Sequence, residues 1–359
     1  MKDQQPLVTG TTTSNDTDFA FQSRALEEVS RTFALTIPQL PAGLREVVAN
    51  AYLLCRIADT IEDDPQLTSE AKRYFADQFV HVLEGGCAPM RFSHELYPQL
   101  STQLPATERE LVLNTPRVVR ITHGFDERQQ QPMRRCVRIM SSGMASFQEN
   151  ASRAGLVDMA AMDSYCYHVA GVVGEMLTDL FCVHDARIDA RRAHLRQLAV
   201  SFGQGLQMTN ILKDVWEDYA RGACWLPRDV FDGADFCLSQ MTPGTTHSAF
   251  AQGYEILLGV ARGHLANALE FTLAIPADQV GMRRFCMWAV GMAVLTLRKI
   301  HSTPGFRTGA QVKISRRSVA TTIKMTNLCV KRDWLLRAMF DTLTRTLPVG
   351  TAQEHALSH

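Results

Sequence analysis

The amino-acid sequence predicts an all-α protein, folded as a single large helical bundle with a central cavity between its helices. Apolar residues recur at intervals of three and four along several long stretches, as expected for amphipathic helices. Proline and glycine separate these stretches, and strand-like alternation is almost absent. No repeat of about 20 to 50 residues is evident, which argues against a solenoid.

The predicted helices follow one another along most of the chain. The periodic stretches are 44–61, 133–150, 161–182, 193–219, 249–273, 280–301 and 318–346. Residues 311–314 form the only short strand candidate. Both ends of the chain are polar, so we predict a disordered lead-in over residues 1–20, a helical domain over 21–346 and a polar tail over 347–359.

Composition limits the class of function. The chain has 359 residues, of which 46% are hydrophobic, and its formal net charge is zero, so no overall field would attract nucleic acid. We see no signal peptide, and no apolar run approaches the roughly 20 residues of a transmembrane anchor. The nine cysteines lack CxxC or CxxH spacing, which predicts reduced thiols in a cytoplasmic protein rather than a disulfide framework or a zinc site.

The first of these helices ends in an acidic cluster, which reads DTIEDD over residues 59–64. Asp59 and Asp63 are four residues apart, so their carboxylates would lie one turn apart on one helix face. Tyr52 and Arg56 extend the same polar stripe. Alone, such a stripe is typical of the solvent-facing side of an amphipathic helix.

A second cluster changes that interpretation. It reads DVWED over residues 214–218, and Asp214 and Asp218 are again four residues apart. Apolar residues flank this stripe on both sides, which favours an internal cleft. Two unit charges about 4 Å apart repel by up to about 4 kcal/mol at an effective dielectric near 20, so such clusters need solvent or a cation. We therefore expect the two helices to face each other and bind Mg²⁺, which accepts a few carboxylates, water and substrate phosphates.

Four segments resemble the squalene/phytoene synthase family, in order and at similar spacing over roughly residues 25 to 320. They are SRTF (30–33) with LCRIADTIEDD (54–64), YCYHVAGVVG (165–174), QMTNILKDVWED (207–218) and WLP (225–227). The resemblance implies a helical bundle of the isoprenoid synthase type. It also implies head-to-head joining of two prenyl diphosphates.

Two further stretches resemble the squalene branch of that family, namely Phe285-Cys286 and VKI at 312–314. This implies condensation of two farnesyl diphosphates to presqualene diphosphate, followed by NADPH-dependent reduction to squalene. A non-reductive member that makes presqualene diphosphate, dehydrosqualene or phytoene is the main alternative. A non-catalytic assembly or scaffold relative should have lost the carboxylates. A head-to-tail prenyltransferase or terpene cyclase would not be expected to carry the stretches around Tyr165 and Phe285.

The resemblance also implies roles for individual residues. Mg²⁺ would be held by Asp59, Asp63, Asp214 and Asp218, with Glu62 and Glu217 as further ligands or as neighbours that support them. Diphosphate would be bound by Arg31, Arg56 and Lys213, with hydrogen bonds from Gln207 and Asn210. Alternatively, Arg56 pairs only with Asp59, and Arg31 is a surface residue.

Tyr165 is the candidate for proton transfer in the first half-reaction, and a buried core tyrosine is the alternative. Phe285 would flank the carbocation with its ring, or would be an ordinary core residue. Gly171 and Gly174 would let a prenyl tail pass close to the backbone, or would allow close packing of two helices.

The basic residues Lys313 and Arg316 would contact the phosphates of NADPH, or form a solvated patch. NADPH would bind without a Rossmann module, because no GxGxxG motif follows a strand. The family usually carries Gly-Arg before its aromatic-Leu-Pro element, whereas this chain reads RGACW over 221–225, so Arg221 would replace the missing base. Because the implied product is very apolar, we also expect transient docking of the protein on a membrane surface.

Overall fold

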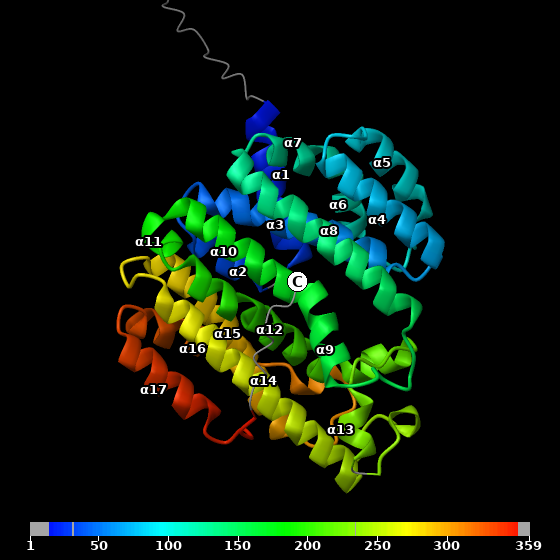
Figure 1. Ribbon diagram of the computed structural model, residues 1–359, viewed down its shortest axis with the longest axis vertical. Coiled ribbons are helices and arrows are strands. Elements are labelled where there is room, and N and C mark those ends of the chain that lie inside the picture. The colour runs from blue at the N-terminus through cyan, green and yellow to red at the C-terminus, as the bar shows by residue number, and fades with distance from the viewer. Residues whose placement is uncertain (1–13, 31, 234, 351–359) are drawn as a thin grey trace, which may run out of the picture.

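The computed structural model describes residues 14–30, 32–233 and 235–350, and it is built from helices (Figure 1). The described part of the chain contains no strand, only one isolated bridge between Leu156 and Pro227. The predicted all-α bundle is therefore confirmed. Arg31 and most of the predicted lead-in and tail lie outside the described residues. The chain is already helical from Ser14, earlier than the predicted domain start at residue 21.

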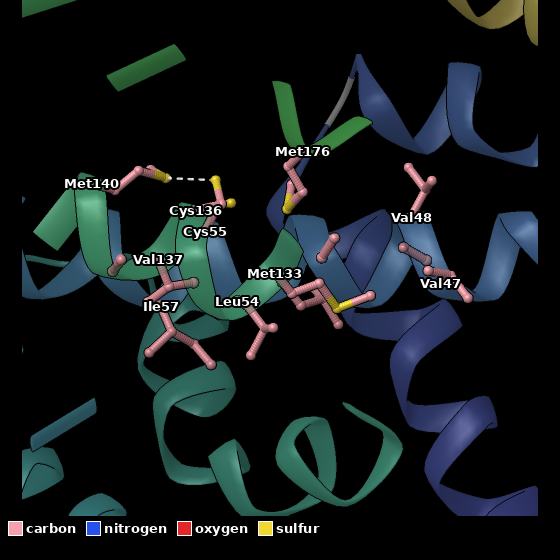
Figure 2. Close-up of a cluster of buried hydrophobic side chains, with 14 of the residues drawn as sticks. Val47, Val48, Leu54, Cys55, Ile57, Met133, Cys136, Val137, Met140 and Met176 are labelled. Atoms are coloured by element: carbon pink, nitrogen blue, oxygen red, sulfur yellow. Dashed lines mark hydrogen bonds between the residues drawn. The ribbon is translucent and has the colours of Figure 1, made fainter. Parts of the chain in front are cut away.

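The first half of the chain forms one group of helices, in the upper part of Figure 1. These are α1 (Ser14–Val29), α2 (Phe33–Thr36), α3 (Leu44–Asp63), α4 (Ser69–Leu83), α5 (Pro89–Leu96), α6 (Ala106–Leu113), α7 (Thr115–His123) and α8 (Glu127–Glu149). Helix α3 packs on α8 through buried side chains that include Leu54, Ile57, Met133 and Val137 (Figure 2). This contact fixes the direction of the first acidic cluster, which ends α3.

The second half forms the other group, lower in Figure 1. It contains α9 (Met159–Cys166), α10 (Val172–His184), α11 (Ala186–Asp189), α12 (Arg192–Ala220), α13 (Arg228–Asp232), α14 (Ser248–Ala274), α15 (Val280–His301), α16 (Arg316–Cys329) and α17 (Asp333–Thr344). A π-helical turn, Tyr167–Gly171, joins α9 to α10. Such turns are often found at functional sites.

Helix α10 connects the two groups, because it packs on α8 on one side and on α12 on the other. Its contact with α12 is unusually close. A Cβ atom placed on Gly174 would lie 2.1 Å from the carbonyl oxygen of Ala199, and one on Gly203 would lie 2.1 Å from that of Ala170. Glycine at these positions lets the two backbones touch.

Two expectations need correction. Residues 311–314 are not a strand, because Gly309–Val312 is a 3-10 turn and the chain then runs extended into α16. The periodic stretch 318–346 is two helices, α16 and α17, separated by a short turn at 330–332.

Two helical stretches have the length and apolar composition to cross a bilayer, Met159–His184 and Val280–His301. More than half of each is buried inside the protein. The same composition is found in core helices of globular proteins, and both stretches pack in this way within the bundle.

Candidate active site

The first acidic cluster faces the interior of the bundle rather than bulk solvent. The Glu62 side chain is buried, and only 28% of the Asp59 side chain is exposed. Burial raises the pKa of Asp59 to about 7, although Arg56 opposes the shift, and the charges of Asp63 and Glu108 raise it further. Burial and the charge of Asp63 raise the pKa of Glu62 to about 8. Without a bound cation, Asp59 and Glu62 therefore tend to keep their protons near neutral pH, and a cation beside them would favour the deprotonated carboxylates.

The second acidic cluster lies on α12, where the helix is kinked. Asp214 has non-helical backbone angles, φ −100° and ψ 15°. Just before it, the Tyr254 hydroxyl donates a hydrogen bond to the Leu212 carbonyl, a side-chain insertion that can bend a helix. Asp218 is buried and pairs with Arg221. Burial raises the pKa of Asp218 against the effect of Arg221, and Asp214 and Asp63 add to the rise.

The two clusters act on the same space. Asp63 of α3 and Asp218 of α12 influence each other's charge, and Arg221 stabilises both carboxylates. Tyr165 of α9 lies near carboxylates of both clusters, because Glu62, Asp63 and Asp218 all add to the effect of burial in raising its pKa. Helices α3 and α12 both pack on α10 but share no substantial contact of their own. The effect of Asp63 on the pKa of Asp218 indicates that carboxylates of the two clusters lie near each other.

The donors suit a hydrated Mg²⁺ ion better than an ion enclosed by protein. Within the described ranges, no three His, Cys, Asp or Glu side chains converge closely enough to hold a metal ion by themselves. Mg²⁺ keeps several waters and is often held by one or two carboxylates together with substrate phosphates. Carboxylates with raised pKa values on both sides of one space provide that donor set.

Arg56 is prepared for an anionic ligand. Its Nη2 donates to the Tyr52 hydroxyl at 3.0 Å, and its Nη1 lies 4.0 Å from carboxylate oxygens of both Asp59 and Glu108. Among the residues that the structure describes, none forms a hydrogen bond with its buried Nε. Burial opposes the charge, but Asp59, Tyr52 and Glu108 hold the pKa of Arg56 above its ordinary value. An unused donor on a guanidinium that stays charged is what a diphosphate oxygen requires.

Three residues missed by the sequence analysis also belong to this region. Glu108 of α6 faces Arg56. Lys72 of α4 donates to the Glu62 carbonyl, and Gln148 of α8 hydrogen-bonds the Glu62 side chain. Lys72, Gln148 and Glu62 line a small cavity of about 90 Å³ between α3, α4 and α8. No motif marks these residues, because each comes from a helix that the acidic patterns do not include.

On α12, Lys213 lies beside the second cluster. Its Nζ is 3.0 Å from Asp214 and 3.4 Å from the Asn210 side-chain oxygen. Gln207 is half-buried one turn earlier. Glu217 instead accepts a hydrogen bond from the Gly309 amide at 2.8 Å, so its carboxylate holds the 3-10 turn that leads to the basic segment.

Tyr165 is fixed by aromatic neighbours. Its ring stacks on Trp225 with centroids 4.2 Å apart, and it packs in a T-shaped arrangement with Phe147 with centroids 5.3 Å apart. It is buried, and its pKa is held well above the ordinary value, first by burial and then by Glu62. The hydroxyl therefore keeps its proton at neutral pH, near carboxylates of both clusters.

Other predicted residues lie in the packed interior. Phe285 is buried at the start of α15 with its ring 6.1 Å from that of Phe181, in the core shared with α3, α8 and α10. Gly174 faces Ala199, so the helix-packing interpretation describes its surroundings. A Cβ atom on Gly171 would lie 3.0 Å from the Tyr167 ring.

The predicted cofactor residues, Lys313 and Arg316, are exposed. They follow the 3-10 turn that Glu217 holds, so they lie along the chain close to the second acidic cluster. Gly203 and Gly205 lie inside α12.

A family model described as squalene/phytoene synthase matches residues 26–318. The chain belongs to the squalene/phytoene synthase family. Squalene synthase ERG9 of Candida albicans is 27% identical over 307 residues, which cover 84% of this chain and 66% of that protein. Botryococcus squalene synthase of Botryococcus braunii is 28% identical over 310 residues, 85% of this chain and 62% of that protein. The chain thus spans about two-thirds of the length of these curated relatives.

Solved structures confirm the fold. A ligand complex of TcSQS has a TM-score of 0.74 at 24% identity and covers 92% of this chain and 91% of that one. A dehydrosqualene synthase in complex with ligand has a TM-score of 0.64 at 20% identity, covering 89% and 99%. The bundle is therefore the all-helical fold of this family, as the four sequence segments predicted.

Proposed function

We propose that the protein is a squalene synthase, which joins two farnesyl diphosphates head to head and reduces the product with NADPH. The observation that carries the proposal is the position of Tyr165, near the acidic clusters of α3 and α12 and influenced by carboxylates of both. The family membership of the chain and the relatives named squalene synthase support the choice of reaction. The nine free cysteines agree with a reducing, cytoplasmic environment.

The negatively charged diphosphate of the substrate would be bound by basic and polar side chains and by Mg²⁺. Arg56 and Lys213 would bind diphosphate oxygens from opposite sides of the site, and Asn210 and Gln207 would add hydrogen bonds. Asp59, Asp63, Asp214 and Asp218 would hold Mg²⁺. When bound, Mg²⁺ supplies the positive charge that stabilises departing pyrophosphate.

Arg221 would be the second-cluster base in place of the arginine that the family usually carries later in the sequence. It forms an ion pair with Asp218, and its positive charge lowers the pKa of Asp63 against the effect of burial. Gly222 has a positive φ of 95°, which lets the chain turn sharply after Arg221 toward the WLP element. That turn would leave the Arg221 guanidinium at the edge of the site, where it could bind a diphosphate oxygen.

In the first half-reaction, Tyr165 would relay the proton that is lost as the cyclopropane closes, because it would donate its hydroxyl proton to the departing pyrophosphate as it takes up the proton from the closing ring. Its fixed ring would also present a π surface to a carbocation. Phe285 and Gly171 would shape the walls around the prenyl chains, whereas Gly174 packs against the Ala199 backbone of α12. In the second half-reaction, NADPH supplies a hydride, and Lys313 and Arg316 would bind its phosphates.

The test is a product assay. Purified protein is incubated with farnesyl diphosphate and Mg²⁺, with and without NADPH, and products are extracted and identified by mass spectrometry. We expect presqualene diphosphate without NADPH and squalene with it. Identical products in both conditions would support the non-reductive alternative, and farnesyl or geranylgeranyl products from isopentenyl diphosphate would support a head-to-tail enzyme.

Two variants test the metal assignment. Asp59→Ala and Asp218→Ala each remove one carboxylate from opposite sides of the site, and we expect turnover to be abolished while the helical circular dichroism signal stays unchanged. Glu255→Ala, which removes a carboxylate of α14 paired with His301, is the matched control and should keep its activity. Near-normal turnover in either aspartate variant would overturn the Mg²⁺ assignment.

A further inference from the structure

Large apolar side chains are exposed at one end of the α16–α17 hairpin. Met325 and Leu328 lie three residues apart on α16 and are 45% and 68% exposed, and Trp334, in the first turn of α17, is 66% exposed. The turn between the helices is short, so all three side chains belong to the same end of the hairpin. The other three tryptophans of the chain are buried, at 4% to 6% exposure.

The same segment carries a concentration of positive charge. Residues 313–332 contain six basic residues and no acidic one, in a chain with 37 of each kind. The six are Lys313, Arg316, Arg317, Lys324, Lys331 and Arg332, and all are exposed. None of them pairs with an acidic side chain in the described ranges, since the nearby acids Asp333 and Glu270 pair with Arg283 and Arg337.

The buried side chain of Arg283 supports this end of the hairpin through hydrogen bonds to the turn. Arg283 is almost completely buried, and its guanidinium donates to the Val330 carbonyl at 3.1 Å and to Asp333 at 2.7 Å. It also donates to the carbonyls of Leu273 and Ile275. A buried charge with this many partners fixes the backbone on both sides of the turn. The exposed side chains therefore project from a rigid support.

We propose that Met325, Leu328 and Trp334, with Lys324, Lys331 and Arg332, form a docking surface for an anionic lipid bilayer, which we call the hairpin tip. Tryptophan at the interface, aliphatic side chains beside it and basic residues around them are the combination that binds the headgroup region of anionic membranes. Charge complementarity selects this occupant, because a soluble apolar partner would not need the three cations of the tip, which form no ion pair within the described ranges. The proposal is independent of which product the site makes.

The hairpin tip is joined to the proposed active site through the chain. Helix α16 follows the 3-10 turn whose Gly309 amide donates to Glu217 of the second acidic cluster. Docking at the hairpin tip would therefore fix the orientation of the active-site side of α12 relative to the bilayer.

The test uses the full chain and lipid vesicles, without any turnover measurement. Co-sedimentation compares vesicles of phosphatidylcholine alone with vesicles that also contain phosphatidylserine, and we expect binding only to the second kind, weakened by salt. Brominated acyl chains should quench the fluorescence of Trp334. Trp334→Phe should lose this quenching while the protein still sediments with the vesicles.

Substitutions locate the surface. Leu328→Asp and the double variant Lys331→Glu/Arg332→Glu should each weaken binding to anionic vesicles by more than about tenfold. Ile256→Asp is the matched control, since Ile256 is exposed on α14 away from the tip, and it should bind as the wild type does. Circular dichroism and thermal melting of each variant establish that it is folded.

Three outcomes would overturn the proposal. Equal binding to both kinds of vesicle would remove the electrostatic argument. Unchanged binding in the folded Leu328→Asp and charge-reversed variants would place the contact elsewhere. Self-association of the wild type that Leu328→Asp abolishes, in sedimentation velocity without lipid, would identify a second copy of the chain as the occupant.

Discussion

The indole ring of Trp225 lies flat on the phenol ring of Tyr165, with ring centroids 4.2 Å apart and 7° between the planes. Trp225 follows the second acidic cluster and Tyr165 precedes the π-helical turn, so this contact ties α9 to the segment that follows α12. Phe147 packs in a T-shaped arrangement with the same phenol ring. The position of the Tyr165 hydroxyl therefore depends on both neighbours.

The first prediction concerns Tyr165→Phe. The substitution keeps the ring and its stacking on Trp225 but removes the hydroxyl near the carboxylate clusters. We expect formation of presqualene diphosphate to fall by about 10²- to 10⁴-fold, the usual contribution of a positioned acid or base, with little change in melting temperature. Single-turnover assays and thermal melting measure the two effects. Full activity in this variant would make Tyr165 an ordinary core residue.

The second prediction concerns Arg56. Arg56→Lys keeps a positive charge but loses the planar fork and the Nε donor, which forms no hydrogen bond with the residues that the structure describes. We expect kcat/KM for farnesyl diphosphate to fall by about 10- to 100-fold, because a hydrogen bond to a charged group contributes about 1.5–3 kcal/mol. Steady-state kinetics measure the change.

Glu108→Gln is the matched control for Arg56. It removes the negative charge opposite the guanidinium and leaves the side-chain shape in place. Less competition for Arg56 should make inorganic pyrophosphate, measured as a competitive inhibitor, bind as tightly as in the wild type or a few-fold tighter. Weaker pyrophosphate binding in Glu108→Gln would mean that Glu108 supports the site rather than competes with the ligand.

Much of the site could be predicted because both acidic clusters are local in sequence. Four-residue spacing places Asp59 with Asp63, and Asp214 with Asp218, whatever the rest of the fold does. The spatial partners could not be predicted in this way. Glu108 comes from a helix that no motif marks, and it meets Arg56 only because α6 packs on α3.

The shorter helices escaped prediction for a different reason. Proline is expected to separate helical stretches, yet Pro116 lies in the first turn of α7, where the missing amide hydrogen costs nothing. Pro132 lies inside α8, six residues from its start. The division of 318–346 into α16 and α17 depends on a long-range contact of Arg283 with the turn. Periodicity alone carries no sign of that contact.

The third prediction concerns pH and Mg²⁺. Burial raises the pKa of Asp59 to about 7 and of Glu62 to about 8, so between about pH 4 and 8 the folded protein binds more protons than the unfolded chain does. The stability of the metal-free protein should therefore fall as the pH rises through this window. Mg²⁺ binds the deprotonated carboxylates, so its stabilising effect should grow over the same range.

Thermal melting with EDTA or with Mg²⁺, at about pH 5.5 and about pH 8, measures this difference. Glu62→Gln should flatten the pH dependence of the metal-free protein, since an amide does not titrate. A rise in melting temperature on Mg²⁺ addition that is equal at both pH values would contradict the assignment of these carboxylates as the metal-binding groups.

The last prediction separates two roles for Gly174. A Cβ atom there would lie 2.1 Å from the Ala199 carbonyl oxygen, so Gly174→Ala should push α10 away from α12 and lower the free energy of unfolding by about 1–3 kcal/mol, despite the better helix propensity of alanine. Urea unfolding measures the loss. At Gly233 a Cβ atom would lie 3.5 Å from its nearest neighbour, so Gly233→Ala is the matched control and should change stability by less than about 0.5 kcal/mol. Lost turnover in a Gly174→Ala protein of unchanged stability would instead place a prenyl chain against this glycine, because only a ligand would then meet the added methyl group.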